Sequence, residues 1–160
     1  MKTLTKGLAA AAMMLAGSAA EAQNSKPTIV LVHGAFADGS SWNGVISRLE
    51  KHGYPVIAAA NPLRSVKGDA ASIAAILSSL KVPVVLVGHS YGGSVISEAA
   101  LGKANVKALV YVAAFAPEVG ETGIGLSGKF PGSTLGPTLA PPVPLASGGN
   151  DLYIRQDKFP

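Results

Sequence analysis

Residues 84–93, Val-Val-Leu-Val-Gly-His-Ser-Tyr-Gly-Gly, constrain the fold of this chain more than any other stretch. The run opens with four aliphatic residues and shows no polar alternation, which predicts a strand buried on both faces. It then reaches a Gly-x-Ser-x-Gly sequence, and from Val95 to Ala100 the apolar residues recur at helical spacing. Ser90 is therefore predicted to lie at a sharp turn between a strand and a helix.

Two glycines, Gly88 and Gly92, stand two residues before and two residues after Ser90. A turn this tight brings the strand backbone against the helix backbone and leaves no room for a Cβ atom. Such a nucleophile elbow holds the serine in a strained conformation above the carboxyl edge of the sheet, beside the N–H groups of the first helical turn. A glycine-rich helix start in another α/β protein is the alternative, and it leaves the upstream motif described below unexplained.

Three further apolar runs, over residues 28–32, 55–60 and 106–113, are predicted to be strands. Between the strands, apolar residues recur at i, i+3, i+4 and i+7, which predicts helices with one apolar face. These residues are Trp42, Val45, Ile46 and Leu49 in the first helix and Ile73, Ile76, Leu77 and Leu80 in the second. Ser40 or Ser41 is expected to cap the first helix, and Asp69 the second. Strands alternating with helices predict an open parallel sheet that is covered on both faces and binds ligands at the carboxyl ends of its strands.

The first 22 residues are predicted to be a secretory signal peptide. Lys2 and Lys6 precede an apolar run, and Ala20-Glu21-Ala22 supplies the small residues of a cleavage site. The run is too short to span a bilayer, and no later stretch is long enough. The mature protein is therefore expected to be exported, periplasmic or secreted, without a membrane anchor. A buried N-terminal helix is the alternative interpretation.

The composition argues against several classes of function. The formal net charge is +4, and the basic residues are scattered rather than gathered in a patch, so no nucleic-acid partner is expected. The chain has no cysteine, which excludes disulfides and thiolate ligands. The three histidines are far apart and show no metal-ligand spacing, so no metal site is expected.

Residues 118–160 differ in character from the rest of the chain. Glycine and proline are dense there, and the apolar residues keep neither the helical nor the strand period. This segment is predicted to be an excursion over the sheet, the beginning of a lid, with residues 152–154 as a short ordered piece. A disordered tail is the alternative interpretation.

Four motifs together resemble the α/β-hydrolase superfamily. They are His33-Gly34-Ala35-Phe36, Asn61-Pro62-Leu63, Gly88-His89-Ser90-Tyr91-Gly92-Gly93 and Val110-Tyr111-Val112-Ala113-Ala114-Phe115-Ala116-Pro117. The branch most similar to this chain includes plant methylesterases, hydroxynitrile lyases and bacterial relatives. The resemblance implies a three-layer α/β-hydrolase fold that is incomplete at the C-terminus. Residues 23–117 would form the N-terminal part of the core, and residues 118–160 the start of the lid or cap.

The resemblance also implies roles for individual residues. Ser90 would be the nucleophile, and the oxyanion hole would consist of the backbone N–H groups of Tyr91 and Ala35, with Phe36 as the neighbouring candidate. Gly34 would let its loop approach the serine. In this superfamily the triad acid and histidine come from strands after the lid, so neither is expected in this chain. His33 and His89 are not expected to serve as the base.

These expectations lead to a functional hypothesis. By ancestry the protein would be a serine hydrolase of the esterase type, which forms an acyl-enzyme through Ser90 on a small ester and needs no cofactor. The chain itself would be catalytically incomplete. The alternatives are a non-catalytic remnant that binds a small molecule and a hydroxynitrile-lyase-like activity.

Overall fold

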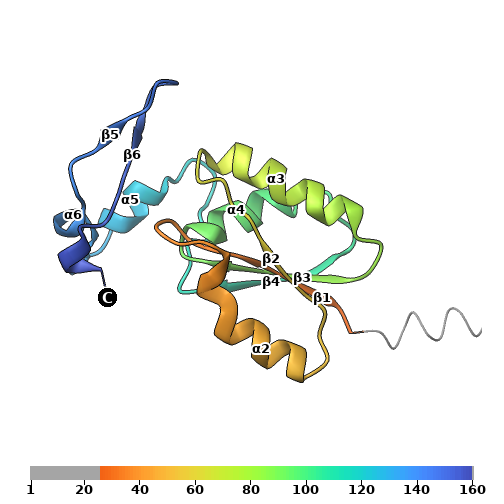
Figure 1. Cartoon of the computed structure of the whole chain (residues 1–160). Helices are drawn as coiled ribbons and strands as arrows, with labels where there is room; N and C mark the ends of the chain where they lie inside the picture. The colour runs from red at the N-terminus through yellow and green to blue at the C-terminus, as the bar shows by residue number, and fades with distance from the viewer. Residues whose placement is uncertain (1–25, 160) are drawn as a thin grey trace, which may run out of the picture.

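The computed structural model describes residues 26–159, so the predicted signal peptide over residues 1–22 lies outside the described residues (Figure 1). Four parallel strands form one sheet in the order β2-β1-β3-β4. Their bounds are Thr28–Val32 for β1, Val56–Ala59 for β2, Val84–His89 for β3 and Val106–Val112 for β4. The predicted strands over residues 55–60 and 106–113 are therefore confirmed, each within a residue at its ends.

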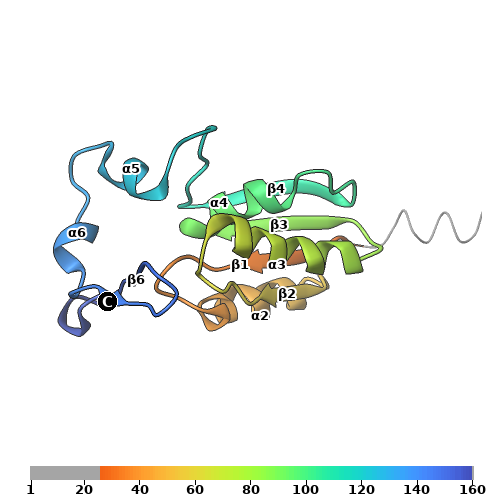
Figure 2. The same ribbon diagram turned by 90° about the horizontal axis from the view of Figure 1, so that it is seen from above.

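Helices cover both faces of the sheet, as Figures 1 and 2 show. On one face lie the 3₁₀ helix η1 and the helix α2, and on the other lie α3 and α4. Their bounds are Gly39–Trp42 for η1, Asn43–Lys51 for α2, Val66–Ser79 for α3 and Tyr91–Ala99 for α4. The predicted three-layer α/β architecture is confirmed.

The central strand β1 explains why this sequence forms three layers. All five of its residues are buried, and successive side chains point to opposite faces. Ile29 and Leu31 join Trp42 in the core under α2, whereas Val30 and Val32 join the core under α3 and α4. A strand that buries both faces needs an unbroken apolar run, and this is the pattern of residues 28–32.

Both predicted helix caps are wrong. The cap at the start of η1 is Asp38, whose Oδ1 accepts from the backbone N–H of Ser40 at 2.7 Å. The cap of α3 is Ser65, whose extended backbone lets its Oγ accept from the N–H of Gly68 at 3.1 Å. Asp69 lies inside α3, past the position from which a side chain can reach the free N–H groups.

Residues 118–159 extend beyond the carboxyl edge of the sheet (Figure 2). They form short elements: α5 Gly123–Gly128, α6 Leu135–Thr138, β5 Val143–Pro144, β6 Asn150–Asp151 and the 3₁₀ helix η2 Gln156–Lys158. The ordered piece expected at residues 152–154 lies directly after β6, and its Ile154 forms a bridge with Leu139. Each helix within residues 26–159 is too short or too polar to cross a bilayer.

The tight packing of α4 against the end of β4 predicts unequal effects of two Gly→Ala substitutions. A Cβ at Gly93 would lie 2.2 Å from the carbonyl oxygen of Phe115, whereas a Cβ at Gly44 in α2 would meet nothing within 4 Å. We expect Gly93→Ala to lower the free energy of unfolding by about 1–3 kcal/mol or more, because backbone must move. Gly44→Ala should raise it by about 0.5–1 kcal/mol. Urea unfolding of both variants tests this, and equal effects would contradict the packing.

Candidate active site

Ser90 is the single residue between β3 and α4, and it has the strained backbone that the sequence predicts for the elbow. Its φ is 52° and its ψ is −120°. The Ser90 carbonyl oxygen accepts from the N–H groups of Gly93 and Phe115, each at 3.0 Å, and its N–H donates to the carbonyl of Val112 at 3.3 Å. These bonds tie the turn to the end of β4 and hold it in a conformation that a free serine would avoid.

Backbone strain gathers at this edge of the sheet. Within the described residues, the non-glycine residues with positive φ are Phe36 at 61°, Leu63 at 59°, Ser90 at 52° and Ala113 at 43°. Each of them follows one of the four parallel strands. Such conformations cost about 1–3 kcal/mol each and persist where the surrounding structure imposes them. Such clustering at one edge is typical of a functional site.

Three glycines allow backbones to converge around Ser90. A Cβ at Gly34 would lie 2.9 Å from the Cβ of Ser90, so the loop after β1 lies directly against the serine. A Cβ at Gly88 would lie 2.6 Å from the carbonyl oxygen of Gly92. A Cβ at Gly92 would lie 2.5 Å from the carbonyl oxygen of Val32. A side chain at any of these positions would push the loop, the strand or the helix away.

Backbone donors without protein acceptors adjoin this convergence. Within residues 26–159, neither the Ala35 N–H nor the Phe36 N–H makes a hydrogen bond, and the Ser90 hydroxyl has no partner there. Tyr91 is the first residue of α4, so its N–H has no acceptor inside the helix. The structure thus brings the three N–H groups predicted to form the oxyanion hole to the same edge as Ser90, and none of them has an acceptor among the described residues.

His33 is buried and has both ring nitrogens engaged. Its Nδ1 lies 2.9 Å from the carbonyl oxygen of Gly34, and its Nε2 lies 3.2 Å from the backbone nitrogen of Asn61. A carbonyl can only accept, so Nδ1 carries the proton and Nε2 accepts the Asn61 N–H. The neutral ring links the loops after β1 and β2, and it has no free nitrogen to serve as a base.

Among the described residues, the other two histidines make no hydrogen bond with the Ser90 hydroxyl. The His89 ring packs edge-on against Trp42, with ring centroids 6.3 Å apart. His52 ends α2 and places its Nδ1 2.7 Å from the carbonyl oxygen of Arg48. No serine–histidine pair is therefore formed among the described residues.

The acidic residues near this edge also have structural roles. Hydrogen bonding from Ser40, through its side chain and its backbone N–H, lowers the pKa of Asp38 below its usual value. Asp151 forms an ion pair with Arg64 at 2.8 Å, and Asp157 is exposed beside Arg155. Within residues 26–159, no group of three or more metal-ligating side chains is arranged to hold an ion.

Asp69 has a role at this edge other than the helix cap predicted for it. It is fully buried, and its Oδ2 accepts from the Tyr91 hydroxyl at 2.8 Å while its Oδ1 accepts from the Arg64 N–H at 3.1 Å. Desolvation of the phenol and its hydrogen bond to Asp69 raise the pKa of Tyr91 well above its usual value. The signal was in the sequence, because Asp69 stands four and eight residues before the buried Ile73 and Leu77, on the same face of α3.

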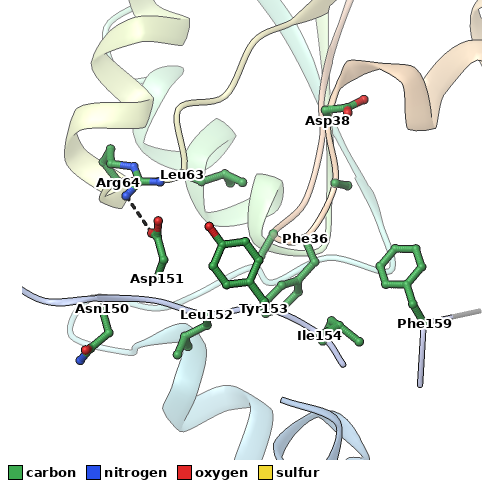
Figure 3. Close-up of a pocket in the computed structure, with 12 residues that line it drawn as sticks. Phe36, Asp38, Leu63, Arg64, Asn150, Asp151, Leu152, Tyr153, Ile154 and Phe159 are labelled. Carbon is green, nitrogen blue, oxygen red and sulfur yellow. Dashed lines mark hydrogen bonds and ion pairs between the residues drawn. The ribbon is translucent and has the colours of Figure 1, made fainter. Parts of the chain in front are cut away.

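A cavity of about 620 Å³ opens beside this edge (Figure 3). Its walls come from the loop after β1, the loop after β2 and the segment from Asn150 to Phe159. Ala35 lines it, so the cavity is continuous with one of the predicted oxyanion donors.

A parallel sheet between two layers of helices, with a serine in a strained strand-to-helix turn, defines a protein of the α/β-hydrolase class. The sequence profile described as the alpha/beta hydrolase family matches residues 29–158. The chain therefore belongs to the alpha/beta hydrolase family, and the resemblance seen in the motifs is confirmed.

Individual relatives agree with this assignment. The alpha/beta hydrolase nvfD of Aspergillus novofumigatus is 34% identical over 116 residues, which cover 61% of this chain and 46% of the relative. The carbendazim hydrolyzing esterase of Nocardioides sp. is 33% identical over 116 residues, which cover 62% of this chain and 47% of the relative.

Among solved structures, this chain is similar to an extracellular alpha/beta-hydrolase from a Paenibacillus species, which shares structural and functional homology with tobacco salicylic acid binding protein 2. The two are 26% identical with a TM-score of 0.59, covering 71% of this chain and 50% of the other. The chain spans about half the length of the curated relatives it matches.

The buried contact between Asp69 and Tyr91 predicts a costly Tyr91→Phe substitution. Removing the hydroxyl leaves one oxygen of a buried carboxylate without a donor, so we expect the free energy of unfolding at pH 7 to fall by about 1–3 kcal/mol. Tyr54→Phe is the matched control, because the Tyr54 hydroxyl makes no hydrogen bond within the described residues.

The direction of the Tyr91 pKa shift adds a pH dependence to this prediction. A raised pKa means that the folded protein keeps the phenol proton above pH 10, where an unfolded chain begins to lose it. The stabilisation by Tyr91 is thus present below about pH 10 and declines above it. The difference between wild type and Tyr91→Phe, measured by urea unfolding from pH 7 to 11, should narrow at the alkaline end, and a widening difference would contradict the assigned contact.

Proposed function

We propose that this chain carries the nucleophile and oxyanion hole of a serine hydrolase that acts on a small ester. The observation that carries the proposal is the position of Ser90, at a strained turn with the Gly34 loop packed directly against its Cβ. Fold and family support a hydrolase, and an esterase among the relatives supports ester as the substrate class.

The proposed reaction begins with attack of the Ser90 Oγ on the carbonyl carbon of the ester. The serine proton passes to a general base, and the carbonyl oxygen becomes negative in the tetrahedral intermediate. The N–H groups of Ala35 and Tyr91, with Phe36 as the neighbouring donor, would hydrogen-bond this oxygen, and one such donor contributes about 2.7–4 kcal/mol to lowering a barrier. The intermediate collapses to acyl-Ser90 when the alkoxide leaves with a proton from the base.

Hydrolysis of acyl-Ser90 completes the cycle. Water attacks the acyl carbon, gives a proton to the base and releases the carboxylic acid, and Ser90 regains its proton. This chemistry needs protein groups and water and no cofactor. Both ring nitrogens of His33 are engaged, so His33 is not free to act as the general base. His89 packs its ring against Trp42 and makes no hydrogen bond with Ser90 among the described residues.

A second function, ligand binding without turnover, is favoured because no histidine of the described residues makes a hydrogen bond with Ser90. Without a base a serine hydroxyl is a weak nucleophile, and loss of a triad member lowers turnover by about a millionfold in a serine protease. The cavity beside Ala35 would still bind a small molecule. Activity and binding therefore need separate measurements.

Reaction with a fluorophosphonate probe tests the role of Ser90. In protein expressed from the complete reading frame, we expect covalent labelling at Ser90 and its loss in Ser90→Ala. Gly34→Ala should slow labelling by about a hundredfold, because its Cβ would displace the loop that carries one oxyanion donor. Ser97→Ala, which removes a hydroxyl from the same helix, is the control and should label normally.

Three outcomes separate the two functions. Labelling together with ester turnover supports the enzyme. Binding of a small ester without labelling supports the binding protein. Labelling that persists in Ser90→Ala contradicts the assignment of the nucleophile.

A further inference from the structure

The cavity beside the site is built from segments that are far apart in the sequence. Residues 35–38 form one wall, Leu63 and Arg64 form another, and residues 150–154 with Phe159, from the late segment Asn150–Phe159, form the third. Its volume of about 620 Å³ is within the range of about 300–1,000 Å³ that small-molecule sites occupy.

The lining of this cavity is mainly apolar and aromatic. Phe36 and Leu63 supply the core side, and Tyr153 with Phe159 supplies the side contributed by the late segment. Figure 3 shows the Tyr153 ring pointing toward Phe36 and Leu63 across the cavity. Flat aromatic walls of this kind favour an aromatic ligand, which they can contact with ring faces and edges.

Two of these residues are held by strain. Phe36 and Leu63 have φ values of 61° and 59°, in the left-handed region that bulky side chains avoid. The backbone conformation at these two positions does not require a large apolar residue, since glycine or asparagine would adopt that conformation more easily. Large apolar side chains at strained positions on a cavity wall are a reason to expect a ligand there.

The charged groups of the lining disfavour an anionic ligand. Arg64 is the cation among the lining residues, and its Nη1 is paired with Asp151 at 2.8 Å. Asp38 adds a second carboxylate, and its lowered pKa keeps it ionised. The lining therefore carries one cation against two carboxylates and has no unpaired positive charge to offer.

The wall formed by the late segment is anchored to the core at Arg64. The Arg64 N–H donates to the buried Asp69, and the Arg64 guanidinium reaches Asp151 in β6. The same Asp69 accepts from Tyr91 beside the serine, so the cavity wall and the elbow share one buried carboxylate. These contacts connect the wall to the residue next to Ser90.

We propose that this cavity binds an uncharged aromatic portion of the ester, with Phe36, Leu63 and Tyr153 as the residues that determine this specificity. The inference rests on the proposed function for its placement of the ester next to Ser90. Binding itself needs no serine chemistry, so the two can be tested apart.

Two fluorescent probes with one aromatic framework test the proposal. N-phenyl-1-naphthylamine is neutral, and 8-anilinonaphthalene-1-sulfonate carries a sulfonate. We expect the neutral probe to bind at least tenfold more tightly in a fluorescence titration. Tyr153→Ala should weaken its binding about tenfold, whereas Phe130→Ala, which truncates an exposed aromatic residue that does not line the cavity, should not.

A second variant guards against unfolding of the late segment in Tyr153→Ala. Leu63→Asn suits the positive φ at this position, so the fold should be retained or stabilised, yet it places a polar group on the cavity wall. We expect it to weaken binding of the neutral probe about tenfold. Its circular dichroism spectrum should match that of the wild type, and its free energy of unfolding in urea should equal or exceed the wild-type value.

The outcomes are distinct from those of the labelling experiment. Ser90→Ala should bind the neutral probe as the wild type does, so loss of labelling alone leaves the cavity proposal standing. Equal affinity for both probes would overturn the proposal. Unchanged binding of the neutral probe in a folded Leu63→Asn variant would overturn it as well.

Discussion

Close approach of three backbone segments around Ser90 is the constraint on which the rest of this structure depends. The ends of β1 and β3 and the start of α4 meet where Gly34, Gly88 and Gly92 leave no space for a side chain. The strained backbone of Ser90 is held by this packing and by hydrogen bonds to Val112, the last residue of β4, and to Phe115 after it. The apolar cores on the two faces of the sheet supply the stability that offsets the strain.

The parts of the fold that follow from local pattern could be read from the sequence. Unbroken aliphatic runs predicted β1 and β3, and the Gly-x-Ser-x-Gly sequence predicted the strained turn between β3 and α4, because these features depend on neighbouring residues. The helix caps were predicted wrongly, since Ser65 and Asp69 are both acceptable caps by type and only the register of α3 distinguishes them. The burial of Asp69 follows from its partner Tyr91, which lies 22 residues away in sequence.

The cavity could not be predicted, for a similar reason. Its walls come from residues as distant as Phe36 and Tyr153, and the ion pair that ties them joins residues 87 positions apart. No local period encodes such contacts. The candidate nucleophile and its backbone donors could be predicted from the motifs. The groups that would select a substrate could be identified only from the three-dimensional structure.

Strain, burial and charge point to the same edge of the sheet. Positive φ values follow every parallel strand there, a buried carboxylate holds the tyrosine next to the serine, and the adjoining cavity offers aromatic walls without a free cation. A protein that only needed to fold would have little reason to retain these features together.

The most direct measurement is a crystal structure of the protein after reaction with an alkyl phosphonate. We expect a covalent bond from the Ser90 Oγ to phosphorus, with the phosphoryl oxygen about 2.7–3.1 Å from the backbone nitrogens of Ala35 and Tyr91. An adduct on another residue, or a phosphoryl oxygen turned away from both nitrogens, would contradict it.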